Sequence, residues 1–198
     1  MANDKPIILI TGATGRQGGA TARELLGRGR RVRVMTRKPD GEKAQALAAL
    51  GAEVIRGDYD DARSLERSLT GAWGCFSTQD TWEAGVVREE EQGKRFAELA
   101  RKAGVEHFVY TSVGSAHRRT GIPHFDNKRR IEETVRAAGF PSYTILRPVF
   151  FMENFGSPSF LPALREEKLV IGIRPETVLQ MIAGRGHREV RAPRLRAP

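Results

Sequence analysis

Short apolar runs alternate with segments in which apolar residues recur at helical spacing along most of the chain. The apolar runs predict strands, and the amphipathic segments between them predict helices. The predicted strands cover residues 7–11, 31–36, 53–56, 73–77, 107–111 and 143–146. The predicted helices cover residues 17–28, 42–50, 62–69, 126–138 and a longer stretch around 83–103.

A glycine stands where each predicted helix should end, just before the next strand. These glycines are Gly29, Gly51, Gly71, Gly104 and Gly139. Glycine at this place is typical of helix C-termini. Strict alternation of strand and helix predicts an α/β fold with a doubly wound parallel sheet of the Rossmann type, and a ligand site at the carboxyl ends of the strands.

The first predicted strand runs directly into a glycine-rich turn, Thr11-Gly-Ala-Thr-Gly-Arg-Gln-Gly-Gly19. Gly12 permits the tight turn, Gly15 lets a diphosphate approach the backbone, and Gly18 lets the following helix pack closely. That helix would point its N–H groups and its positive dipole end at the diphosphate. We therefore interpret the turn as a phosphate cradle, with a plain structural turn as the alternative.

A basic residue, Arg37, follows the second predicted strand. An acidic residue here would accept hydrogen bonds from the ribose of NAD, whereas a guanidinium can bind the 2′-phosphate of NADP. One charge-assisted hydrogen bond of this kind would favour NADP over NAD by about ten- to a hundredfold. The alternative is that Arg37 and Lys38 are a solvated pair in a loop.

Polar residues also follow the third and fourth predicted strands. Asp58 could accept a hydrogen bond from the adenine amino group, and Tyr59 could cover the adenine ring. Asp60 or Asp61 could equally cap the next helix. The polar stretch 77–81, which contains Gln79, lies where the second ribose is expected.

Composition excludes several other classes of protein. Of the nine net positive charges, four come from the tail 184–198, which holds five arginines and one glutamate. The rest of the chain is mildly basic and carries no nucleic-acid-binding module, so we expect no direct DNA binding. Cys75 is the one cysteine and is predicted to be a buried strand thiol, and the four histidines lack metal-site spacing.

No apolar run approaches membrane-spanning length, and residues 1–6 lack the apolar stretch of a signal peptide. The sequence therefore predicts a cytoplasmic protein that makes no contact with membranes. It gives no indication of the oligomeric state.

These motifs resemble those of the NmrA-like family of atypical short-chain dehydrogenase/reductases. The resemblance covers about residues 5–182 and rests on the glycine-rich turn, Val32-Arg-Val-Met-Thr-Arg37, Gly51-Ala-Glu-Val-Ile-Arg-Gly-Asp58, His124-Phe-Asp-Asn-Lys128 with Glu132-Glu133, and Leu146-Arg-Pro-Val-Phe-Phe-Met-Glu-Asn154. It implies binding of NADP(H), with NAD(H) weaker, through Gly12, Ala13, Thr14, Gly15, Arg16, Gln17, Gly18, Arg37, Asp58, Tyr59, Gln79, Lys128, Phe151, Glu153 and Asn154.

Catalysis is the point at which the sequence departs from the parent superfamily. Short-chain dehydrogenases use Tyr-x-x-x-Lys on a helix, and here the frame reads His124-Phe-Asp-Asn-Lys128. Lys128 is therefore expected to hold the nicotinamide ribose. His124 could pass a proton or could simply pack, and Ser112 could polarise a carbonyl or make a loop hydrogen bond.

Two functions follow from the resemblance. One is an NADPH-dependent reductase of quinones or similar small molecules, which need little help from a general acid. The other is a non-catalytic NADP(H) redox sensor that regulates a protein partner.

The pattern changes after Pro148, where an aromatic-rich stretch precedes a predicted helix at 162–168 and a short strand at 169–173. We divide the chain into a Rossmann domain (1–149), a partial substrate-side subdomain (150–183) and an aberrant basic tail (184–198). Because family members continue beyond this length, we expect a C-terminal truncation. A shifted reading frame is our hypothesis for the tail, and a genuine tail that recruits an acidic partner is the alternative.

Overall fold

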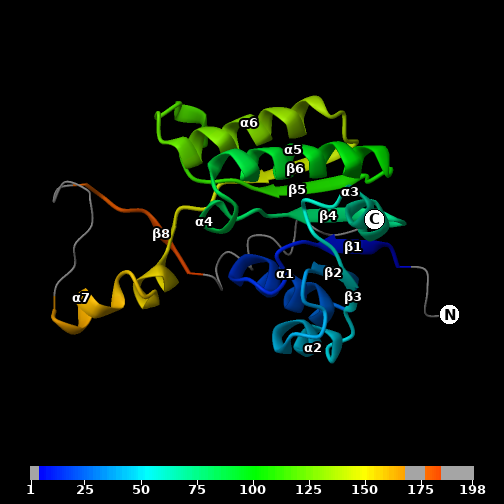
Figure 1. Cartoon of the computed structure of the whole chain (residues 1–198), viewed down its shortest axis with the longest axis horizontal. Coiled ribbons are helices and arrows are strands. Elements are labelled where there is room, and N and C mark those ends of the chain that lie inside the picture. Colours follow the sequence, from blue (N-terminus) through cyan, green and yellow to red (C-terminus); the bar gives the residue numbers. More distant parts are fainter. Residues whose placement is uncertain (1–4, 168–176, 184–198) are drawn as a thin grey trace.

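The computed structural model describes residues 5–167 and 177–183. Within them, parallel strands form a six-stranded sheet in the order β3-β2-β1-β4-β5-β6 (Figure 1). The strands are β1 (Ile7–Ile10), β2 (Arg31–Thr36), β3 (Glu53–Arg56), β4 (Ala72–Ser77), β5 (His107–Thr111) and β6 (Ser142–Leu146). The strand order changes direction at β1, which lies between β2 and β4. This arrangement confirms the predicted doubly wound fold.

Helices cover both faces of the sheet (Figure 1). On one face lie α1 (Arg16–Gly27) and α2 (Glu42–Ala48), and on the other lie α3 (Ala62–Leu69), α5 (Val86–Lys102) and α6 (Pro123–Ala137). Alternate strand residues supply the two cores. Ile8 and Ile10 pack with Leu25 of α1, whereas Leu9 packs with Phe96 of α5. The central strand β1 is therefore apolar on both sides, as a covered parallel sheet requires.

The prediction of one long helix around residues 83–103 is wrong, because the structure has two helices there. The structure has a short helix, α4 (Thr81–Ala84), which is separated from α5 by Gly85 at φ 80°. Asp80 ends the preceding loop, and its side chain accepts a hydrogen bond from the backbone N–H of Trp82 at 2.9 Å. This cap and the left-handed glycine give α4 a direction of its own.

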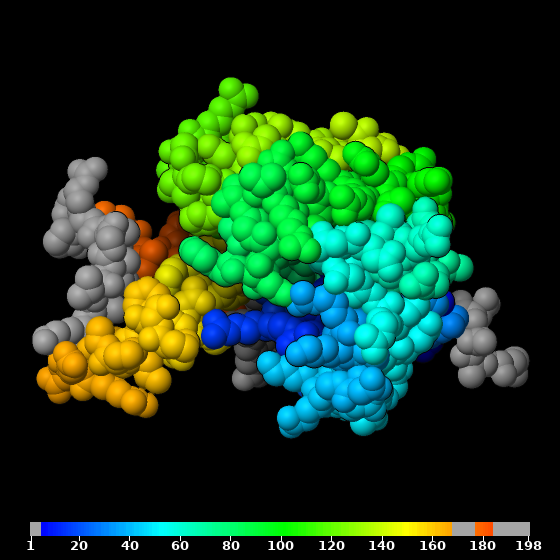
Figure 2. Space-filling view, in the orientation of Figure 1, coloured from blue at the N-terminus to red at the C-terminus, as the bar shows by residue number. Residues whose placement is uncertain are grey.

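The segment after β6 forms a lobe that projects from the body of the molecule (Figure 2). It contains β7 (Phe150–Phe151), the 3-10 helix η2 (Met152–Gly156) and α7 (Leu161–Arg165), and β7 pairs in parallel with β8 (Met181–Ile182). The rings of Phe150, Phe155 and Phe160 pack against one another with centroids 5.3–6.0 Å apart.

Some of the expectations concern residues that are not described. The predicted strand at 169–173 and the tail 184–198 lie outside the described residues, and the division of the chain at residue 150 stays a prediction. Among the residues that are described, no helix has the length and apolar character needed to cross a membrane.

A buried carboxylate ties α6 to the end of β6. The carboxylate of Glu132 is fully buried and accepts hydrogen bonds from Arg147 Nε at 2.8 Å and Arg147 Nη2 at 2.5 Å. Arg136 donates a further hydrogen bond at 2.9 Å. Burial acts to raise the pKa of Glu132, but the hydrogen bonds from Arg147 and Arg136 outweigh it and lower the pKa.

We expect Arg147→Met to lower the free energy of unfolding by about 1.5–3 kcal/mol, because Glu132 loses both hydrogen bonds from Arg147 and keeps the one from Arg136. The control is Arg28→Met, which removes an exposed pair with Glu24 and should cost less than about 1 kcal/mol. Denaturant unfolding of both variants measures the difference. Equal free energies of unfolding for Arg147→Met and Arg28→Met would show that the pair of Glu132 and Arg147 does not hold α6 in place.

The same pair predicts a pH dependence. Because the fold lowers the pKa of Glu132, its contribution is present above the ordinary carboxyl pKa of 4.5 and is lost as the pH falls below that value. The variant Glu132→Gln lacks this titration. Its melting temperature should therefore fall less steeply than that of the unaltered chain between about pH 5 and pH 3.

Candidate functional site

The glycine-rich turn joins the end of β1 to the start of α1. Gly12 has a φ of +59°, and a Cβ there would lie 2.5 Å from Thr78 Cγ2. A Cβ on Gly18 would lie 2.4 Å from the carbonyl oxygen of Gly12. The backbone thus has the left-handed turn and the close helix packing that were expected of Gly12 and Gly18.

The first turn of α1 points toward this loop. Gly15 is the N-cap residue, and no side chain caps the helix. The backbone N–H of Gly15 donates to the oxygen of Gly12 at 2.9 Å, which closes the turn. The positive end of the helix dipole therefore lies at the carboxyl edge of the sheet, in the position that suits an anion.

Two residues of the turn reach distant parts of the chain. Arg16 Nη1 donates to Asn154 Oδ1 at 3.0 Å, and Gln17 Oε1 accepts from Thr111 Oγ1 at 2.7 Å. The turn is thereby joined to the projecting lobe and to the end of β5. Of the other predicted turn residues, Ala13 is buried in the core and Thr14 is half-buried. Phe151 is half-buried in β7 and Glu153 is exposed in η2.

The loop after β3 is held tightly within the fold. Asp61 caps α3 by accepting from the backbone N–H groups of Arg63 and Ser64, whereas Asp58 Oδ1 accepts from the N–H of Asp60 at 3.0 Å. Asp61 is therefore the capping residue, and Asp60 is not. The adenine role of Asp58 stays a prediction.

Tyr59 braces the glycine-rich turn. Its hydroxyl donates to Thr11 Oγ1 at 2.6 Å or to the oxygen of Thr78 at 3.0 Å, and its ring meets Phe96 edge-on. Burial raises the pKa of this hydroxyl well above its ordinary range, although the hydrogen bond with Thr11 opposes the shift. The hydroxyl thus stays protonated. The adenine-covering role of Tyr59 also stays a prediction.

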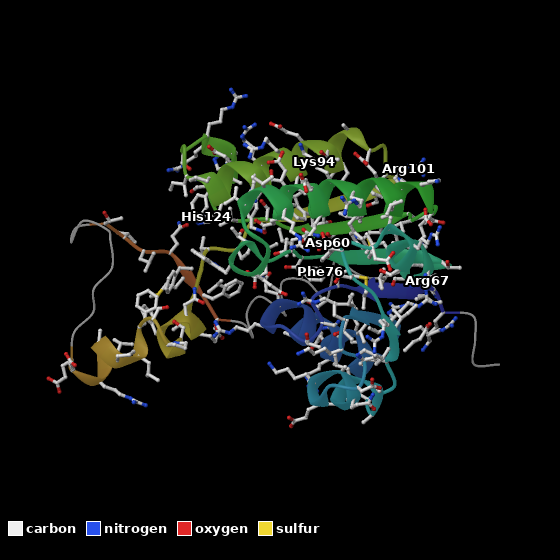
Figure 3. All side chains as sticks on the ribbon, viewed as in Figure 1. Asp60, Arg67, Phe76, Lys94, Arg101 and His124 are labelled. Carbon is white, nitrogen blue, oxygen red and sulfur yellow. The ribbon has the colours of Figure 1, made fainter. Side chains whose placement is uncertain are left out.

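A hollow of about 550 Å³ lies beside this loop. It is lined by Asp60, Arg88, Glu91, Arg95 and residues 84–87 at the junction of α4 and α5. The hydrogen bond from Arg88 lowers the pKa of Asp60. Asp60 lies near the middle of the molecule in Figure 3.

Arg37 follows β2 and pairs with Glu83 of α4. The side chains of Arg37 and Glu83 are 59% and 55% exposed. An exposed pair of this kind contributes little stability, so that another anion could take the place of the carboxylate at small cost. Gln79, between β4 and α4, is buried and donates to Ser77 Oγ at 2.9 Å.

Lys128 and His124 lie one turn apart on α6 but contact different groups. Lys128 Nζ donates to Glu89 Oε1 at 2.6 Å. The His124 ring lies 5.7 Å from the ring of Trp82 and 4.6 Å from that of Phe125, on the side of the molecule nearest the lobe (Figure 3). These contacts are compatible with a packing role, and a proton-transfer role for His124 stays a prediction.

Ser112 and Cys75 are both buried. The backbone N–H of Ser112 donates to the oxygen of Leu146 at 2.7 Å. Cys75 lies fully buried in β4, which confirms the predicted buried strand thiol, and burial raises its pKa.

Sequence reasoning missed Glu89 and Glu83. Glu89 is the first of a run of three glutamates, residues 89–91, within the helix predicted around residues 83–103. A usable signal was present, because Glu89 shares its helical stripe with Gly93, Phe96 and Ala100, which are buried. A carboxylate on an apolar stripe needs a buried partner.

The sheet order and the glycine-rich turn define the class of Rossmann folds. Comparison with known sequences gives the family, because a family model described as the NmrA-like family matches residues 4–175. The NmrA-like family domain-containing oxidoreductase malD of Malbranchea aurantiaca is 34% identical over 176 residues, or 83% of this chain and 52% of that protein. FrzB of Cladobotryum sp, described in the same way, is 34% identical over 79% of this chain and 50% of that protein. The chain belongs to the NmrA-like family and spans about half the length of the curated relatives it matches.

Solved structures share the fold. Citrobacter sp. triphenylmethane reductase complexed with NADP(H) gives a TM-score of 0.79 at 24% identity, covering 94% of this chain and 64% of that one. The NADPH-dependent quinone oxidoreductase QOR2 from Escherichia coli, complexed with NADPH, gives a TM-score of 0.67 at 29% identity, covering 81% of this chain and 54% of that one. Nmra, a negative transcriptional regulator in complex with NADP, gives a TM-score of 0.66 at 25% identity, covering 77% of this chain and 48% of that one.

The turn geometry predicts the effect of adding one methyl group. Gly18→Ala should lower the free energy of unfolding by about 1–3 kcal/mol, because its Cβ would displace the carbonyl of Gly12. It should also weaken binding of NADP(H), the ligand that the sequence predicts, by more than about tenfold. Thermal unfolding and calorimetric titration measure the two effects.

The matched control is Gly27→Ala, at the other end of the same helix, where a Cβ would meet nothing within 4 Å. This variant should be neutral or up to about 1 kcal/mol more stable. If Gly18→Ala behaved like the control, the close packing at Gly12 would not shape the site.

Proposed function

We propose that this chain binds NADP(H) and belongs to an NADPH-dependent reductase of quinones or similar small molecules. The observation that carries the proposal is the turn between β1 and α1, in which neither Gly12 nor Gly18 has space for a side chain. The turn lies where the strand order changes direction, which is the usual site for a dinucleotide in such sheets. The NADP(H)-bound proteins that share this fold support the same ligand.

Arg37 selects the cofactor in this proposal. Its guanidinium lies just after β2 and is paired with an exposed carboxylate, so a 2′-phosphate can replace Glu83 as its partner. Both groups are anionic acceptors, and the phosphate carries the larger charge. NADP is therefore the preferred dinucleotide.

The chain's own residues hold and orient the cofactor. The N-terminal end of α1 binds the diphosphate, and the Lys128 ammonium binds the hydroxyl groups of the nicotinamide ribose. NADPH, when bound, supplies a hydride to the acceptor. No tyrosine stands one turn before Lys128, so the acceptor needs to accept electrons with little help from a general acid, which favours quinones over ketones.

The missing tyrosine also favours a second candidate function. A protein that binds NADP(H) without strong acid catalysis can act as a redox sensor, whose complex with a partner depends on the bound cofactor. The structural similarity to a negative transcriptional regulator in complex with NADP supports this alternative.

Turnover separates the two functions. The chain is mixed with NADPH and a panel of quinones, and loss of the NADPH absorbance at about 340 nm is followed while NADPH affinity is measured separately. Quinone-dependent loss supports the reductase. Saturable binding without turnover by any quinone would contradict the reductase and support the sensor.

Arg37→Ala should weaken NADP binding by about ten- to a hundredfold and change NAD binding by less than about threefold. The reason is that only NADP carries the 2′-phosphate. Lys43→Ala, which removes an exposed cation on α2, is the control and should change neither affinity appreciably. An equal loss for both dinucleotides would rule out a selective role for Arg37.

A further inference from the structure

Glu89 is a buried carboxylate at the junction of three helices. Its exposed fraction is 0%, and it lies in the first turn of α5, on the stripe that faces the core. Glu89 Oε2 accepts from Thr81 Oγ1 of α4 and, at 2.7 Å, from Asn127 Nδ2 of α6. The other oxygen, Oε1, accepts from Lys128 Nζ at 2.6 Å. Every donor to this carboxylate thus comes from α4 or α6.

The contacts around this junction fix α6 against α5. The side-chain amide of Asn127 also donates to the backbone oxygen of Val86 at 2.9 Å. Further along, Gly93 allows Ile131 to approach so closely that a Cβ would lie 2.6 Å from its Cδ1. These contacts fix the position of α6 along α5, and with it the position of Lys128, which follows Asn127 directly.

The Lys128 ammonium has N–H donors beyond the one that it gives to Glu89. An ammonium carries three N–H groups, and the hydrogen bond with Glu89 uses one of them. The Lys128 side chain remains 13% exposed while its partner is fully buried. Lys128 thus keeps some access to solvent, whereas its carboxylate partner has none.

We propose that Glu89 is the positioning residue for Lys128, and that it aims the remaining N–H groups of the ammonium at the ribose hydroxyls next to the nicotinamide. This role rests on the proposed function, in which Lys128 binds that ribose. Glu89 acts through Lys128 and touches no ligand itself. Its effect is therefore confined to the nicotinamide half of the dinucleotide.

Fold stability alone is a weak reason for such a pair. A buried ion pair contributes little compared with apolar side chains of the same volume, because both charges lose their hydration. An oriented ammonium is useful where a diol has to be bound, since a lysine without a fixed partner samples many rotamers. A role in stability and a role in positioning Lys128 make different predictions. Only the positioning role predicts that a substitution at Glu89 weakens binding of the whole dinucleotide and leaves binding of its adenine half unchanged.

The test compares two ligands by calorimetric titration. Glu89→Gln should weaken NADPH binding by about tenfold, because a neutral amide holds the ammonium less firmly than the carboxylate does. Adenosine 2′,5′-bisphosphate, which carries the adenine half alone, should bind within about twofold of its affinity for the unaltered chain. The control is Glu98→Gln, an exposed glutamate on the same helix, which should change neither affinity.

A double-mutant cycle tests whether Glu89 acts through Lys128. In the Lys128→Met background, adding Glu89→Gln should change NADPH affinity by less than about twofold, because no ammonium remains to be positioned. This comparison also serves if Glu89→Gln alone does not fold, since the double variant has neither charge.

Three results would overturn the proposal. One is an unchanged NADPH affinity of Glu89→Gln, the second is an equal loss for both ligands, and the third is a further loss in the Lys128→Met background. A failure of the unaltered chain to bind NADPH would instead overturn the proposed function, and the role of Glu89 with it.

Discussion

The close approach of α1 to the end of β1 determines where the candidate site can form. The helix can start where it does only because Gly18 has no side chain, since a Cβ would lie 2.4 Å from the oxygen of Gly12. This approach brings the positive end of α1 to the carboxyl edge of the sheet. It also places Arg16 and Gln17 within reach of the lobe and of β5.

Buried carboxylates fix the position of α6 relative to that turn. Glu132 ties the helix to the end of β6 through Arg147, and Glu89 ties its second turn to α4 and α5. Each carboxylate has an arginine or lysine partner, as burial of a charge demands. Lys128 itself contacts Glu89, and Glu132 follows it by one turn of α6, so contacts with α5 and with the end of β6 together fix its position.

The features that could be predicted from the sequence are local ones. The glycine-rich turn, the alternation of strands and helices and the glycines that end the helices each depend on a few consecutive residues, and all are present in the fold. The break at Gly85 was missed because helical periodicity continues across it. Contacts such as Arg37 with Glu83 join residues far apart in the chain, and surface charges have many possible partners. The likeness to NmrA-like proteins was visible from the motifs, whereas the acceptor is not encoded in any of them.

Calorimetric titration of the unaltered chain with NADP and, separately, with NAD shows whether the turn between β1 and α1 holds a dinucleotide. We expect saturable heat for NADP at one site per chain, and weaker binding of NAD by about ten- to a hundredfold. Folded protein that shows no saturable binding of either dinucleotide would contradict this expectation.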